Sequence, residues 1–142
     1  MARRTFRSFP RFSLAFSLLL SGCTSYYHVH PGTLEPGRAV VAPDQRTELW
    51  RRAVGVLLDQ GYVPQILNES AGYISAKRRE DLDNDAFAGT IALVYISAEG
   101  NVRVDVSGGG LFHSESQFVD AVRQRQQLLL SLILNRPAGS AP

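Results

Sequence analysis

The sequence of 142 residues contains only one cysteine, Cys23. A single thiol cannot form an intramolecular disulfide, so a packed core or a partner must stabilise the fold. Long hydrophobic runs are lacking as well. The apolar stretches at residues 12–20 and 128–134 are far shorter than the roughly 20 residues that a membrane-spanning helix needs. Neither stretch can therefore cross a bilayer as a helix.

The sequence also lacks the motifs that would predict an active site. Three glycines at residues 108–110 are not followed by the Lys-Ser/Thr pair of a phosphate-binding loop, and no G-x-S-x-G nucleophile motif occurs. Aspartates alternate at residues 81–85 like the first ligands of a calcium loop, but Ala86 and Ala92 stand where that loop needs glycine and glutamate. We therefore expect no enzymatic activity.

A metal site is not predicted either. His28 and His30 would point to the same side of an extended chain, as two ligands should. A zinc site needs three or four ligands, however, and no cysteine or acidic partner stands nearby, while His113 is distant in the sequence. We expect this aromatic stretch to lie in a tether close to lipid headgroups.

The N-terminus has the three parts of a secretory signal peptide. Four arginines precede the apolar stretch 12–20, and the small residues Ser21 and Gly22 follow it. The motif Leu20-Ser21-Gly22-Cys23 resembles the lipobox of bacterial lipoproteins. This resemblance implies cleavage between Gly22 and Cys23, a diacylglycerol on the Cys23 sulfur and an acylated new N-terminus. The covalent lipid is the only prosthetic group that we expect.

The route and destination of export are less sharply defined. Arg3-Arg4-Thr5-Phe6 resembles the core of a twin-arginine signal, although two arginines also suit an ordinary basic start. Thr24 follows the cysteine where aspartate would suggest retention in the inner membrane. By analogy with enteric lipoproteins, we expect an anchor in the outer membrane that faces the periplasm. The competing interpretation is an ordinary signal peptide followed by a stray thiol.

The net charge of +2 belongs to the whole chain rather than to its processed form. Residues 1–22 contain four arginines and no acidic residue, so 15 less 4 leaves 11 Lys+Arg against 13 Asp+Glu. No basic surface field remains that would favour nucleic acid. We therefore expect the membrane, through the anchor, and proteins as partners, and no nucleic acid.

Four segments are predicted along the chain: a signal peptide at 1–22, a lipidated tether at 23–43, an α+β periplasmic domain at 44–134 and a flexible tail at 135–142. Proline and glycine are frequent in the tether, and they favour loops over packed structure.

The periodicity of residues 44–134 predicts an α+β domain. Apolar residues at three- and four-residue spacing predict helices at 45–60 and 115–134, the first capped by Asp44 and ended by Gly61, the second capped by Ser114 with Gln117. Shorter apolar or alternating stretches predict strands at 62–67, 73–78, 90–97 and 102–107, after which the glycines at 108–110 should break the sheet. We expect the order α-β-β-β-β-α, with two helices on one face of a four-stranded, mostly antiparallel sheet.

The end of the second helix is apolar around most of its circumference, whereas a one-sided helix needs only a stripe. Just before this end, Arg125 and Gln126 interrupt the row of apolar residues that should face the core. The plain interpretation is a deeply buried final turn and a half. Otherwise Leu128, Leu130 and Leu134 form a surface that docks a protein partner or a second copy of the chain.

The segments 58–62 and 68–77 look like those of many small uncharacterised bacterial lipoproteins, in which a helix ends in Gly-Phe/Tyr and a strand begins with a Gly-aliphatic-x-Ala-Lys pattern. The order of elements also resembles the domains of accessory lipoproteins in outer-membrane assembly machines. These resemblances imply a lipid-anchored accessory or assembly protein of the cell envelope that acts through protein contacts. The alternative is a lipoprotein that binds a small ligand or a metal on its sheet.

The lipobox leads to a direct prediction for export. Globomycin blocks the peptidase that cleaves before a lipidated cysteine, so treated cells should accumulate an unprocessed precursor of this chain. A Cys23→Ser variant should lack the lipid. Mass spectrometry of the purified products would show the difference in mass between the unsubstituted chain and the variant. Normal processing in the presence of globomycin would remove the lipoprotein interpretation.

Overall fold

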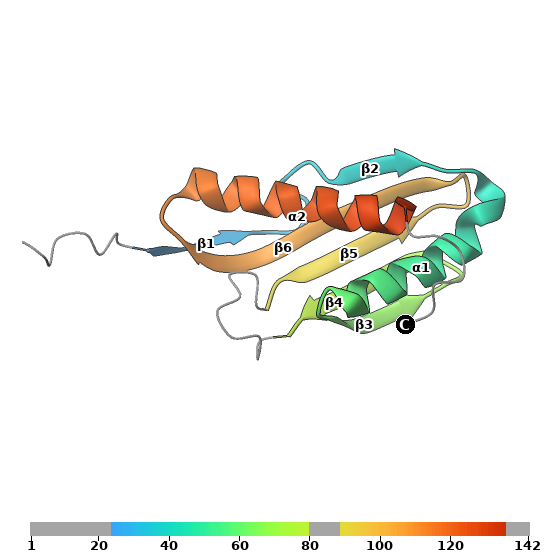
Figure 1. Ribbon diagram of the computed structural model, residues 1–142, viewed down its shortest axis with the longest axis horizontal. Coiled ribbons are helices and arrows are strands. Elements are labelled where there is room, and N and C mark those ends of the chain that lie inside the picture. The colour runs from blue at the N-terminus through green and yellow to red at the C-terminus, as the bar shows by residue number, and fades with distance from the viewer. Residues whose placement is uncertain (1–23, 80–88, 136–142) are drawn as a thin grey trace, which may run out of the picture.

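The computed structural model describes residues 24–79 and 89–135. Two helices and six strands follow one another in these residues, with one short 3-10 turn (Figure 1). Their bounds are β1 Ser25–Val29, β2 Gly37–Val40, η1 Pro43–Gln45, α1 Arg46–Asp59, β3 Tyr62–Asn68, β4 Tyr73–Arg78, β5 Ile91–Ile96, β6 Asn101–Phe112 and α2 Glu115–Asn135.

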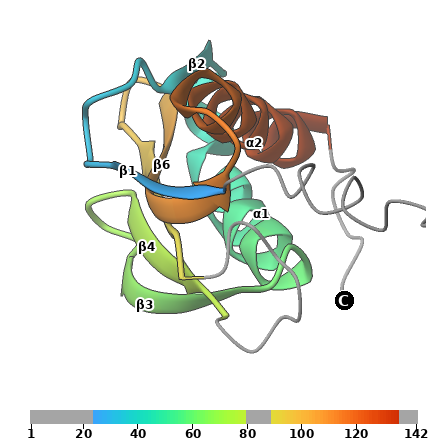
Figure 2. The ribbon, with the colours of Figure 1, turned by 90° about the vertical axis from the view of Figure 1, so that its left-hand side faces the viewer.

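The six strands form one antiparallel sheet in the order β1-β6-β5-β4-β3, with β2 also paired to β6. Both helices pack on the same face of this sheet (Figure 2). Helix α1 carries the chain from β2, beside β6, to β3 at the far edge (Figure 1). The predicted α+β class is right, but the predicted four-stranded sheet is wrong because the sheet has six strands.

The two additional strands come from the segment that was predicted to be a tether. Strand β1 pairs with residues 108–112 of β6, and β2 pairs with residues 101–104, so together they act as one interrupted strand along β6. Val29 is buried in the core, and the ring of Tyr27 stacks on Phe118 of α2 with 6.2 Å between centroids. The prolines and glycines suggested a tether, but several of them belong to the loop between the two strands.

The glycines at 108–110 continue β6 instead of ending it. Gly108 has φ +124°, and a Cβ atom there would lie 2.9 Å from the Cα of Thr90. At Gly109, a Cβ atom would collide with the hydroxyl of Tyr26. Glycine is permissive at positive φ and lets neighbouring atoms approach the backbone closely. The prediction of a sheet break is therefore wrong: the glycines allow the strand to reach β1.

Two helix ends follow the sequence, and the start of α1 does not. Gly61 terminates α1 at φ +77°, and the Ser114 Oγ accepts a hydrogen bond from the Gln117 N–H of α2 at 3.3 Å, both as predicted. The start of α1 differs, because Asp44 lies in the 3-10 turn and Gln45 is the N-cap, without a side-chain hydrogen bond. Of the helices in residues 24–79 and 89–135, none is both long and apolar enough to cross a bilayer.

The core lies between the helices and the sheet. The buried face predicted for β6 is present, since Val102, Val104 and Val106 are buried under the helices, but Asp105 and Ser107 on its other face are buried as well. Buried residues of the other elements complete this layer: Leu49, Ala53, Val56, Leu57, Ile74, Ala76, Val94, Ile96, Phe118, Val122, Leu129 and Ile133. One continuous apolar layer therefore holds the two helices against the inner face of the sheet.

Replacing Gly108 by alanine should cost more stability than replacing Gly109. The first change forces alanine into a strained φ against the backbone of Thr90, which should cost about 1–3 kcal/mol. The second meets only the end of the Tyr26 side chain, which can swing into solvent. Urea unfolding of both variants measures the difference. Equal losses would mean that the close approach to Thr90 is not what requires glycine.

Candidate functional site

In the described chain no helix or strand covers the other face of the sheet, although the loop between β1 and β2 reaches it at Asp105 (Figure 2). Strand β5 shows the consequence most clearly: Ala92, Val94 and Ile96 point into the core, yet Leu93 and Tyr95 on the other side are apolar too. A strand with one wet face normally alternates apolar with polar residues. Strand β5 instead has the pattern of a strand that is covered on both faces.

The outward apolar side chains of β5 continue onto its neighbours. Tyr95 lies directly opposite Tyr73 of β4, and Leu93 lies opposite Ser75, which in turn pairs with Ile66 of β3. We call Ile66, Tyr73, Leu93 and Tyr95 the open-face cluster. Ile66 is more than half exposed, and Tyr95 is 45% exposed. The cluster forms an apolar surface of three adjacent strands, which soluble proteins usually reserve for a contact.

A shallow hollow of about 200 Å³ adjoins this cluster, lined by Tyr73, Leu93, Tyr95, Arg103 and Asp105. Pockets that enclose small molecules generally have volumes of about 300–1,000 Å³. The hollow is smaller than this range and opens onto the sheet surface. Its shape suits one inserted side chain of a partner better than an enclosed ligand.

Asp105 is one of the residues that line the hollow and is only 4% exposed. Gln126 of α2, 1% exposed, donates its Nε2–H to Asp105 Oδ1 at 3.1 Å. The backbone N–H of Gly32 donates to Oδ2 at 3.0 Å, and the guanidinium of Arg103 lies 3.8 Å from the same oxygen. Buried carboxylates need such donors because leaving them unpaired is costly. The break in the apolar row of α2 at Gln126 is thus a satisfied polar contact.

This network occupies the gap between the two strands that share β6. Residues 105–107 of β6 lie between the part paired with β2 and the part paired with β1. Asp105 therefore joins three segments distant in the sequence: the loop after β1, strand β6 and the middle of α2. These contacts fix the position of Asp105, one of the residues that line the hollow.

The leucines predicted to face a partner do not share a surface. Leu130 is only 6% exposed and packs near Gly37 of β2, whereas Leu134 is partly buried against the core. Only Leu128 is well exposed, at 43%. The three leucines therefore do not form one exposed surface in the free domain, and a docking role for them stays a prediction.

The reason is that α2 is enclosed on two sides at its C-terminal half. It packs on β6 and β2 and also against α1. Arg52 of α1 donates to the carbonyl oxygens of Ile133 and Leu134 at 3.4 and 3.3 Å, which satisfies groups that a helix end leaves open. The wide apolar circumference of α2 thus serves its contacts within the domain.

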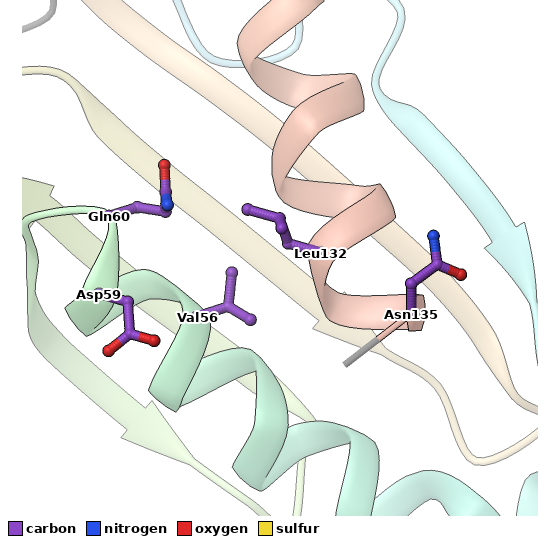
Figure 3. Close-up of a pocket in the computed structure, with 5 residues that line it drawn as sticks. All are labelled: Val56, Asp59, Gln60, Leu132 and Asn135. Carbon is purple, nitrogen blue, oxygen red and sulfur yellow. The ribbon is translucent and has the colours of Figure 1, made fainter. Parts of the chain in front are cut away.

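A second hollow, of about 220 Å³, lies between the C-terminal halves of the two helices (Figure 3). Val56 and Leu132 point into the gap from α1 and α2, while the carboxylate of Asp59 points away from Leu132 (Figure 3). The Oε1 of Gln60, at its edge, accepts a hydrogen bond from Arg125 at 3.4 Å. The lining holds no pairing of a nucleophile with a base, so it does not indicate an active site.

Two histidines, His28 and His30, lie side by side in the structure. The rings of His28 and His30 lie 4.6 Å apart, but within residues 24–79 and 89–135 no group of three or more His, Cys, Asp or Glu side chains could hold a metal. Cys23 and the aspartates at 81–85 lie outside the described residues.

No protein-family model matches the chain, and no curated protein matches it.

The open-face cluster was missed from the sequence, although a signal for it is present. Residues 91–96 read Ile-Ala-Leu-Val-Tyr-Ile, which is apolar at every position, whereas 102–107 alternate with Arg103, Asp105 and Ser107. A strand that is apolar at every position, next to a strand in which apolar and polar residues alternate, predicts a local apolar patch on the solvent-facing side of the sheet.

Asp105 and Gln126 should show strong energetic coupling. Asp105→Ala leaves the Gln126 amide and the Gly32 N–H without their partner, and should cost about 2–4 kcal/mol. Gln126→Leu leaves a buried carboxylate oxygen unpaired. The double variant removes both polar groups, so its loss should fall about 1–3 kcal/mol short of the sum of the single losses.

Urea unfolding of the four proteins in this cycle measures the coupling. Arg103→Gln is the control, because the Arg103 guanidinium is about half exposed and 3.8 Å from Oδ2 of Asp105, so its loss should cost about 1 kcal/mol or less. Strictly additive losses at Asp105 and Gln126 would show that the two side chains do not stabilise each other.

Proposed function

We propose that this protein is a lipid-anchored periplasmic accessory or assembly protein of the cell envelope, which acts by binding another protein through the open-face cluster. The observation that carries the proposal is an apolar surface on the sheet face that the helices leave uncovered. It is formed by Ile66, Tyr73, Leu93 and Tyr95.

The composition of this face supports a protein as the occupant. Two tyrosines and two aliphatic residues lie at its centre, and charged residues, Lys77 and Arg103, lie on the neighbouring positions of β4 and β6. Protein interfaces commonly have an aromatic and apolar centre with a polar rim. Asp105, one of the residues that line the adjoining hollow, offers a buried carboxylate beside Arg103, which could orient a polar group of the partner.

The membrane anchor is the second part of the proposal and rests on Leu20-Ser21-Gly22-Cys23. Three acyl chains at the N-terminus would hold the protein firmly, because each buried CH₂ contributes about 0.8 kcal/mol and single chains bind only marginally. We place the anchor in the outer membrane, with the domain in the periplasm. Anchoring confines the protein near other envelope proteins and raises its effective concentration for them.

The competing function is a lipoprotein that binds a small ligand or a metal. Two of the hollows, of about 200 and 220 Å³, are smaller than usual ligand pockets. A third hollow, of about 470 Å³, is within the usual range but is open to solvent, and it is lined by Glu35, Pro36, Arg38, Arg123, Gln126 and Gln127. We place ligand binding second because the open-face cluster favours protein contact. We propose no enzymatic activity.

The contact surface can be tested by photo-crosslinking in intact cells. A photoreactive phenylalanine analogue at Tyr95 should form a discrete adduct with one envelope protein, or with a second copy of this chain. The adduct is identified by mass spectrometry, and the same pair should be recovered with the analogue placed in the partner. Ile66→Asp in the same chain should abolish the adduct without lowering the unfolding midpoint, because Ile66 is exposed in the free domain.

Leu128 provides the matched control. It is 43% exposed, close to the 45% of Tyr95, but it lies on α2 on the opposite side of the sheet. The analogue at this position should give no such adduct. Identical adducts from positions 95 and 128, or none from position 95, would overturn the open face as the contact surface.

A further inference from the structure

Tyr26 and Leu111 form an exposed pair at one end of the molecule. They lie directly opposite each other in β1 and β6, near the end of the sheet at which β1 begins and β6 finishes (Figure 1). Tyr26 is 66% exposed and Leu111 is 61% exposed. Tyr27, the next residue, stacks on α2, so Tyr26 points to the opposite, uncovered face of the sheet.

The position of this pair matters because of where the lipid would be. Cys23 precedes Tyr26 by three residues, and a fully extended chain spans at most about 3.3–3.6 Å per residue, so the two lie within roughly 11 Å. Strand β1 is held in the sheet from Ser25 onward. A lipid on Cys23 therefore leaves almost no free chain between the membrane and the domain.

We propose that Tyr26 and Leu111 rest in the headgroup region of the membrane that holds the acyl chains, with this end of the sheet facing the bilayer. The inference rests on the proposed lipidation of Cys23. Tyrosine is favoured at membrane–water interfaces because its ring is apolar and its hydroxyl is polar. Leucine beside it adds apolar area at the same depth.

The rest of the open face is held away from the membrane in this arrangement. Between Leu111 and Arg103, the residues of β6 on this face are Gly109, Ser107 and Asp105, none of which is apolar and large. Asp105, which pairs with Leu93 of the cluster, lies six residues from Leu111, or about 20 Å along the strand. The open-face cluster, whose nearest pairing position on β6 is Asp105, would thus remain accessible to a protein partner.

The experiment uses the complete processed protein, reconstituted in phosphatidylcholine and phosphatidylethanolamine vesicles with brominated acyl chains. A lipidated Cys23 has no free thiol, so a second cysteine becomes the single site for a fluorescent label. Leu111→Cys, Tyr95→Cys and Val40→Cys place the label at three points on this face. Val40 pairs with Asn101, ten residues or about 33 Å from Leu111 along β6.

The label at position 111 should be quenched several-fold more strongly than the label at position 40, and the label at position 95 should resemble that at 40. Equal quenching at 111 and 40 in acylated protein would overturn the proposed contact while leaving the anchor intact. Strong quenching at both 111 and 95 would also overturn it, because the whole sheet face would then lie on the bilayer.

The unsubstituted protein separates this inference from the proposed anchor. If Cys23 carries the lipid, the unsubstituted chain should take up no label, and its mass should include the acyl chains. A labelled, unmodified thiol would overturn the anchor, and the membrane orientation with it.

Discussion

The carboxylate of Asp105 is the point on which the arrangement of this domain depends. It accepts hydrogen bonds from Gln126 and from the backbone of Gly32, so it fixes the helix, the long strand and the loop after β1 relative to one another. The contact lies where β6 has no strand partner on the side shared by β1 and β2. A buried carboxylate without donors would be costly, and the segment 24–43 supplies one of the two. The N-terminal strands are thereby part of the folded unit.

Because β1 belongs to the folded unit, the proposed anchor also affects the direction in which the proposed contact surface faces. A long flexible tether would let the domain turn freely, and either face could meet the membrane. With β1 locked into the sheet at Ser25, an anchor on Cys23 restricts the domain to a small range of orientations. The apolar side chains near the anchor and those of the open-face cluster can then serve different partners, a bilayer and a protein, on one uncovered sheet face.

Local patterns predicted most of the single elements because their signals involve neighbouring residues. The two helices, the end of α1 at Gly61, the cap of α2 at Ser114 and the buried valines of β6 follow from spacing, caps and burial on one side. The same patterns gave wrong predictions where proline and glycine are compatible both with loops and with strands. In residues 24–43 they mark the loop and strand ends of an interrupted edge strand, and at 108–110 they permit close contacts within a continuing strand.

The sequence by itself determined the α+β class and the positions of both helices and four of the strands, and it carries the lipobox-like motif on which the proposed anchor rests. Only the tertiary structure decided that two further strands complete the sheet, that Leu130 is buried while Tyr95 is exposed, and that Gln126 meets Asp105. The reason is physical. Periodicity predicts which side chains will be buried. Which element buries them, and which face of the sheet stays exposed, depends on pairing between segments distant in the sequence.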